Sequence, residues 1–168
     1  MAFIEAGDFV GEFKLPNDTF NQAITQNTIN LLTNSTIKNI LGVSLGNDVI
    51  TYIGNNQTPS NTELNAIINP FQLDIDCGVL ESKGLKYAVM GQIYFSRQNG
   101  LKVQQNNISG TSAPTVENGT NTQFVPSIVY EKVNNTVSTI HAIQNYCLMN
   151  SDVYPTYNGQ RFYFESLL

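Results

Sequence analysis

The chain has 168 residues, which fits one domain, residues 1–168, whose hydrophobic core needs neither disulfides nor metal ions. Charged residues make up only 12% of it and the net charge is −5, with no cluster of Lys or Arg, so the composition argues against a protein that grips nucleic acid phosphates. Neutral polar residues, Asn above all, replace the missing charges. Copies with such a surface repel one another only weakly, which favours association.

The first residues, MAFIEAGDFVGEF, carry Glu5, Asp8 and Glu12 and no basic start, unlike a signal peptide. No apolar run approaches the ~18 residues of a membrane span, so we expect a soluble protein made in the cytoplasm, without membrane contact. Cys77 and Cys147 lack a C-x-x-C or Cys/His neighbour, and two buried free thiols are favoured over a disulfide between them. No cofactor or metal is expected.

Three helices are predicted in the first 70 residues. Residues 15–32 place apolar side chains at helical spacing behind the candidate N-caps Asn17, Asp18 and Thr19. In residues 35–54 apolar side chains recur every three to four positions straight through two glycines, and Gly54 supplies the stop. Residues 58–70 contain Ser60-x-x-Glu63, a capping-box pattern, ahead of a short helix that ends before a proline.

A fourth helix is predicted over residues 79–98, where large apolar and small residues share one face at helical period. Gly84 and Gly91 lie on that face. Since glycine costs about 1 kcal/mol relative to alanine inside a helix, their presence indicates that another backbone packs close to them.

The sequence pattern changes from Asn99 to Gln123, where helical period is absent and three glycines and a proline occur. Such a stretch is long for a loop in a compact domain, and its near lack of charge argues against plain disorder. We interpret residues 103–123 as a β-like arm, with short strand-like pieces around Val103 and Thr115-Val116. A mobile loop is the alternative.

A last long helix is predicted over residues 124–150, with Pro126 in its first turn and a Val/Ile stripe that runs to Cys147. Turn signals follow at Tyr154-Pro155 and Asn158-Gly159. Residues 160–168 form a strand-like aromatic tail, which either pairs with another subunit or folds back on its own chain. The predicted fold is therefore mainly α, a bundle of about four to five helices with the arm inserted between the last two long helices.

A hydrolase interpretation starts from Gly42-Val43-Ser44-Leu45-Gly46, which matches G-x-S-x-G, with Asp74 or Asp76 and His141 following in the order of an α/β-hydrolase. The pattern before Ser44 is helical, however, and a nucleophile elbow requires a buried strand. We expect Ser44 to lie in or beside a helical kink. A lone histidine within a helix is typically a surface or core polar residue.

A calcium-loop interpretation of DIDCGVLESKGL, residues 74–85, fails at three positions of the EF-hand pattern. Position five is Gly78, position six is Val79 where glycine is needed, and position twelve is Leu85 where glutamate is needed. No enzyme signature remains, so we expect a protein without catalytic activity.

The order of these pieces resembles the head-tail connector (adaptor) proteins of tailed bacteriophages, which form a ring beneath the portal. The resemblance covers residues 37–159. It rests on ILGVSLGNDVITYI, similar to the family's helix-turn and amphipathic helix; on GLKYAVMGQIYFSRQNG, similar to its central aromatic helix; and on QNYCLMNSDVYPTYNG, similar to its last helix and Tyr-Pro turn.

The resemblance implies a virion protein, a homo-oligomeric ring of about twelve copies between the portal and a tail or neck protein, with genome DNA passing through without sequence-specific binding. Twelve chains of −5 give about −60 per ring, and a negative channel lets a duplex slide without sticking. A net charge of −5 is equally ordinary for any soluble protein.

The arm and the tail are the predicted intersubunit contacts, because open segments leave backbone hydrogen-bonding groups that need partners. The predicted interface residues are Val103, Ile108, Val116, Phe124, Arg161, Phe162, Tyr163 and Phe164. Two other functions stay open. A secreted or surface binding module would use the six N-x-S/T sequons as glycosylation sites, and a small serine hydrolase would use Ser44.

Overall fold

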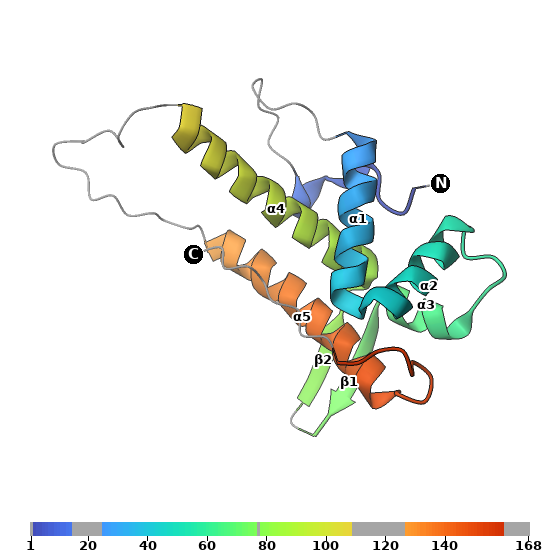
Figure 1. Ribbon diagram of the computed structural model, residues 1–168. Coiled ribbons are helices and arrows are strands. Elements are labelled where there is room, and N and C mark those ends of the chain that lie inside the picture. Colours follow the sequence, from blue (N-terminus) through green and yellow to red (C-terminus); the bar gives the residue numbers. More distant parts are fainter. Residues whose placement is uncertain (1, 15–24, 77, 109–126, 160–168) are drawn as a thin grey trace.

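The computed structural model describes residues 2–14, 25–76, 78–108 and 127–159. This part of the chain is mainly helical, with one small antiparallel sheet (Figure 1), which confirms the predicted fold class. Two short 3-10 turns, η1 (Ala6–Asp8) and η2 (Gly11–Phe13), precede the first helix. None of the described helices is both long and apolar enough to cross a membrane.

Helices α1 (Gln26–Leu41) and α2 (Val43–Gly54) are separated by a single residue. Thr25 caps α1 by accepting a hydrogen bond from the Thr28 N–H at 3.2 Å. Gly42 ends it with φ +79°, a backbone conformation that favours glycine. The predicted boundary between the first two helices was therefore wrong, because the periodic pattern runs unbroken to Leu41. Residues 15–24, including the predicted caps, lie outside the described residues.

Helix α3 (Thr62–Ile68) is the predicted short helix. Its cap is Asn61, whose Oδ1 accepts a hydrogen bond from the Leu64 N–H at 2.9 Å, and not Ser60 as predicted. The helix ends two residues before Pro70, in agreement with the sequence.

A β-hairpin follows, made of β1 (Phe71–Ile75) and β2 (Gly78–Ser82), in a register that pairs Phe71 with Ser82. The prediction of a helix from residue 79 was wrong at this end. Apolar and polar residues alternate strictly in β1, and that period of two places every second side chain against the body. Helix α4 begins only at Leu85, because Gly84 has φ +90°.

Helices α4 (Leu85–Ile108) and α5 (Ser127–Met149) run antiparallel beside one another, and α5 also packs on the hairpin (Figure 1). Helix α4 continues ten residues past the predicted end at residue 98. Gly100 costs about 1 kcal/mol in a helix, and the Leu, Lys and Gln residues that follow it are good helix formers that outweigh this cost. Val103 and Ile108 are thus helical, and the predicted β-like piece around Val103 was wrong.

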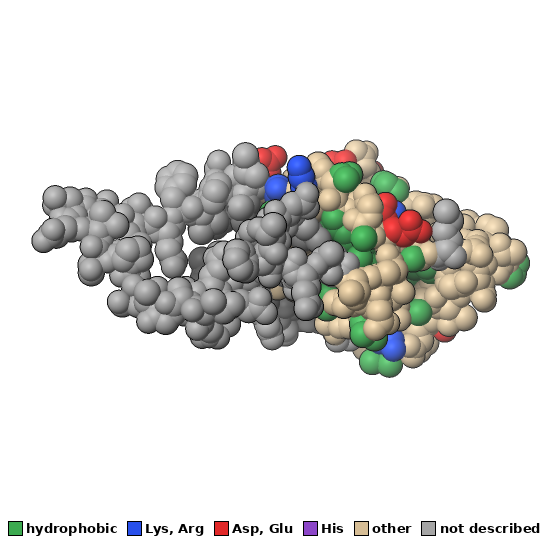
Figure 2. Space-filling view, turned by 90° about the horizontal axis from the view of Figure 1, so that it is seen from above, with side chains coloured by type: hydrophobic (Ala, Val, Ile, Leu, Met, Phe, Trp, Pro, Cys, Tyr) green, Lys and Arg blue, Asp and Glu red, His purple; other side chains and the backbone are tan. Residues whose placement is uncertain are grey.

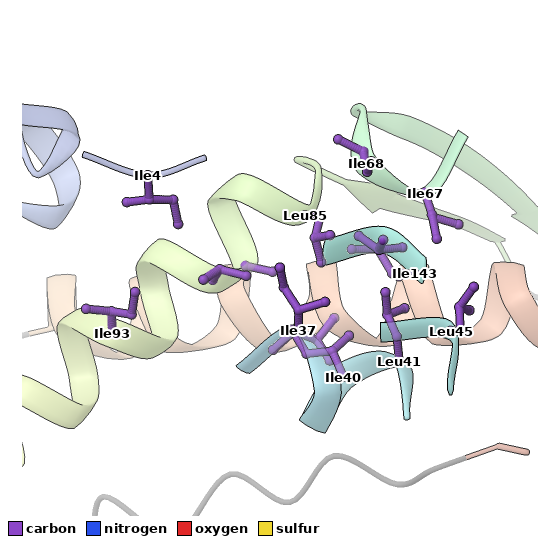
Figure 3. Close-up of a cluster of buried hydrophobic side chains, with 14 of the residues drawn as sticks. Ile4, Ile37, Ile40, Leu41, Leu45, Ile67, Ile68, Leu85, Ile93 and Ile143 are labelled. Atoms are coloured by element: carbon purple, nitrogen blue, oxygen red, sulfur yellow. The ribbon is translucent and has the colours of Figure 1, made fainter. Parts of the chain in front are cut away.

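The core lies where α1, α4 and α5 meet, and α2, α3 and the N-terminal residues close it (Figure 3). Its largest fully buried side chains are Phe95, Ile4, Ile29, Ile37, Ile40, Leu41, Ile67, Leu85, Ile93, Ile140, Ile143 and Val49. Each of the five described α-helices and the N-terminal residues contribute buried side chains to the core. The side chains of the hairpin are at most partly buried, apart from Ser82.

Candidate interaction surfaces

The predicted interface residues fall into two groups. Val103 and Ile108 lie in the last turns of α4. The other six, Val116, Phe124, Arg161, Phe162, Tyr163 and Phe164, lie outside the described residues. The predicted contact between the arm and a neighbouring copy therefore stays a prediction, and it now starts from a helix end and not from a strand.

The residues of the hydrolase interpretation are spread over three elements. Ser44 is exposed in the first turn of α2, directly after the Gly42 break, as predicted. A helix and not a strand leads into it, so the geometry of a nucleophile elbow is absent there. Asp74 and Asp76 are exposed at the hairpin, and His141 is exposed on α5. Across the described residues, no group of three or more His, Cys, Asp or Glu side chains could hold a metal ion.

A depression of about 340 Å³ lies between α2 and the loop that leads to α3. That loop contains Asn56 and Gln57 with φ of +53° and +57°. The buried Tyr52 holds it, since its hydroxyl accepts a hydrogen bond from the Asn61 N–H at 2.9 Å and donates one to Asn65 Oδ1 at 3.0 Å. The polar groups beside the depression are thus used to hold the loop in place, and we assign them a structural role.

The two long helices approach each other closely at Gly91. A Cβ at this position would overlap Thr136 Oγ1 and would lie 2.7 Å from Thr136 Cγ2. Nearby, the Lys132 ammonium of α5 lies 5.1 Å from the centre of the Tyr94 ring of α4. Close packing at Gly91 was predicted, but the predicted partner was another backbone and the observed partner is the Thr136 side chain of α5. At Gly84 the partner is backbone, because a Cβ there would lie 2.9 Å from the Ile68 carbonyl oxygen.

The C-terminal end of α5 presents apolar side chains to solvent. Leu148, Met149 and Val153 are 48%, 60% and 42% exposed. The backbone returns to this surface at Gly159, where a Cβ would lie 3.4 Å from Leu148 Cδ2. The chain therefore enters residues 160–168 beside an apolar surface.

Buried groups anchor this end of the molecule. The Tyr154 hydroxyl donates a hydrogen bond to the Glu63 carbonyl oxygen at 2.7 Å, and burial raises the pKa of Tyr154 above its usual range. Burial also raises the pKa of Tyr157 and that of the free Cys147 thiol to about 12 each. Cys147 is thus a buried free thiol, as predicted, while Cys77 lies outside the described residues.

Residues 2–14, which we name the N-terminal clasp, form a surface that the sequence did not predict. Asp8 makes an ion pair with Lys86 of α4 at 2.8 Å, and the Tyr87 hydroxyl of α4 donates to Glu12 Oε1 at 2.8 Å. The hydrogen bond to Lys86, then that from the Glu5 N–H, lowers the pKa of Asp8. The signal that was available is the alternation of Ile4, Phe9 and Phe13 with acidic residues.

Comparison of this chain with family models, with curated proteins and with solved structures found no match.

Proposed function

We propose that this chain is a structural subunit of a bacteriophage virion, which forms a ring that joins the capsid portal to the tail or neck and lines the DNA channel. The proposal combines the resemblance to head-tail connector proteins with one structural observation. That observation is the antiparallel pair of long helices, α4 and α5, whose free ends extend away from α2, α3 and the hairpin (Figure 1).

The length of these helices supports an assembly role. Helices of 24 and 23 residues are about 36 and 35 Å long at 1.5 Å per residue. Helix α4 ends at Ile108 and helix α5 begins at Ser127, so residues 109–126 connect the two free helix ends and not the ends that pack in the core. A helix pair of this shape can deliver the connecting residues to a neighbouring copy.

The surface chemistry also favours association. Charged side chains are sparse on the face in Figure 2, where backbone, uncharged polar side chains and scattered apolar side chains cover the described part. Copies with this surface repel one another weakly. The exposed apolar residues at the end of α5 add a surface whose burial would stabilise a contact by about 25 cal/mol per Å² of apolar area.

Electron microscopy of the purified chain, alone and with a phage portal protein, tests the proposal. We expect closed rings that resist high salt, because their contacts are largely uncharged. Met149→Lys should weaken assembly by placing a charge in the contact that the ring is proposed to bury. Val43→Lys, the control, changes a similarly exposed apolar residue on α2 and should leave assembly intact.

A second variant separates the tail from the rest of the interface. A chain that ends at Gly159 should fold, since Tyr154 and Tyr157 remain, but should not form rings. Truncated chains that still form rings with a portal would remove the tail from the interface. A full-length chain that stays monomeric with and without the portal would refute the proposed function.

A further inference from the structure

The N-terminal clasp is bound to the body chiefly through side chains. Ile4, Phe9 and Phe13 are only 1%, 6% and 3% exposed. The Phe13 ring lies against two rings of α4, with centroid distances of 4.9 Å to Tyr87 and 5.9 Å to Tyr94. These apolar contacts make the clasp part of the core.

The backbone of the clasp satisfies much of its own hydrogen bonding. The turns η1 and η2 are closed by internal bonds, such as Asp8 N–H to the Glu5 carbonyl at 3.0 Å. Backbone contact with the body runs through the Gln26 side chain of α1, which donates to the Ile4 carbonyl at 2.7 Å and accepts from the Ala6 N–H at 3.3 Å. The clasp therefore resembles a bound peptide whose turns are formed by its own hydrogen bonds.

The receiving face is complementary in charge. Asp8 and Glu12 of the clasp meet Lys86 and the Tyr87 hydroxyl, and the Lys83 ammonium lies 4.8 Å from the centre of the Tyr87 ring. An acidic, aromatic segment thus binds a face that combines aromatic rings with lysines. The same face on any copy of this chain would bind the same segment.

We propose that in the assembled ring the clasp of each copy binds the α1–α4 face of its neighbour, so that adjacent copies are linked by exchanged N-terminal segments. This inference rests on the proposed ring. Residues 15–24 join the clasp to α1 and can span at most roughly 33–36 Å, which sets the largest separation between copies that exchange their clasps. Exchange keeps every contact between a clasp and an α1–α4 face, but the clasp and the face then belong to two different copies.

The Asp8–Lys86 pair offers a test on the unmodified chain. A carbodiimide couples a carboxylate directly to an amine that touches it, and these two groups are 2.8 Å apart. Chains labelled with ¹⁵N and unlabelled chains would be mixed as monomers in equal amounts, allowed to assemble, and coupled. Mass spectrometry of the linked peptides that contain Asp8 and Lys86 then shows whether both come from one chain.

With complete exchange, about half of the Asp8–Lys86 peptide pairs from rings should combine one heavy and one light peptide, because neighbours are drawn at random. Pairs from residual monomer should be all heavy or all light. Lys86→Arg keeps the positive charge but cannot form the amide, so it should abolish the linked pair and confirm its identity.

Rings whose Asp8–Lys86 pairs are only all heavy or all light would overturn the exchange and leave the proposed function standing. Absence of rings would overturn both. The two failures are therefore distinguishable in one experiment.

Discussion

Gly91→Ala tests the close approach of α4 and α5 on which the body of the molecule depends. The added methyl group would overlap Thr136, a residue with no exposed surface, whose hydroxyl is held by a 2.8 Å hydrogen bond to the Lys132 carbonyl. Thr136 cannot rotate away without giving up that bond. Alanine at this position must push the two helices apart or distort a side chain.

The magnitude follows from two opposing terms. Overpacking a dense core costs about 1–3 kcal/mol, whereas replacing glycine by alanine inside a helix gains about 1 kcal/mol. The clash should win, since the overlap involves two atoms of Thr136. We expect the free energy of unfolding to fall by about 1 kcal/mol.

Urea denaturation followed by far-ultraviolet circular dichroism measures this change. Gly54→Ala is the matched control, because a Cβ at the end of α2 meets nothing within 4 Å. In the double variant Gly91→Ala/Thr136→Ala the two clashing atoms are absent, so the pair should be less destabilising than the sum of the single changes. A Gly91→Ala chain as stable as the Gly54→Ala chain would refute the close approach.

Three further predictions concern stability. The lowered pKa of Asp8 means that its ion pair stabilises the fold above the ordinary carboxyl pKa of 3.8 and that this contribution, at most about 1 kcal/mol for a partly exposed pair, is lost as pH falls through the lowered value; acid titration of Asp8→Asn should lack that loss. The raised pKa of Tyr154 means that its contribution to the free energy of unfolding is complete below pH 10.0 and declines above it. Tyr154→Phe should cost about 1 kcal/mol at pH 7 and should remove part of the loss of stability above pH 10.0, as urea unfolding at pH 7 and above pH 10.0 would show. Thr33 Oγ1 is buried without a hydrogen-bond partner among the described residues, so Thr33→Val should raise the melting temperature, and an unchanged or lower value would point to an internal water at this hydroxyl.

The sequence predicted those elements whose apolar residues recur at one period for several turns. The stripe through Leu45 and Val49 on α2 and the one through Ile140 and Cys147 on α5 are buried, because one face of each helix meets the core. The same pattern correctly excluded a strand before Ser44. The spacing of apolar residues within one helix is enough to show which of its faces is buried.

The hairpin was missed because two periods overlap in a short segment. Leu80 stands at helical spacing from Gly84, yet it also stands opposite Leu73 in an antiparallel ladder. Glycine decides between the two. A residue with φ +90° at position 84 cannot continue a helix, and sequence alone does not show whether a glycine has been selected for its small size or for its backbone angle.

The interaction surfaces were harder to predict, since they depend on contacts between residues far apart in the chain. Tyr87 was assigned correctly to the fourth helix, but nothing within that helix indicates a hydrogen bond with Glu12, 75 residues earlier. The N-terminal residues were judged only by what they lack as a signal peptide. Their three buried apolar side chains show that they are a structural element, and an element held mostly by side chains is one that a second copy can supply equally well.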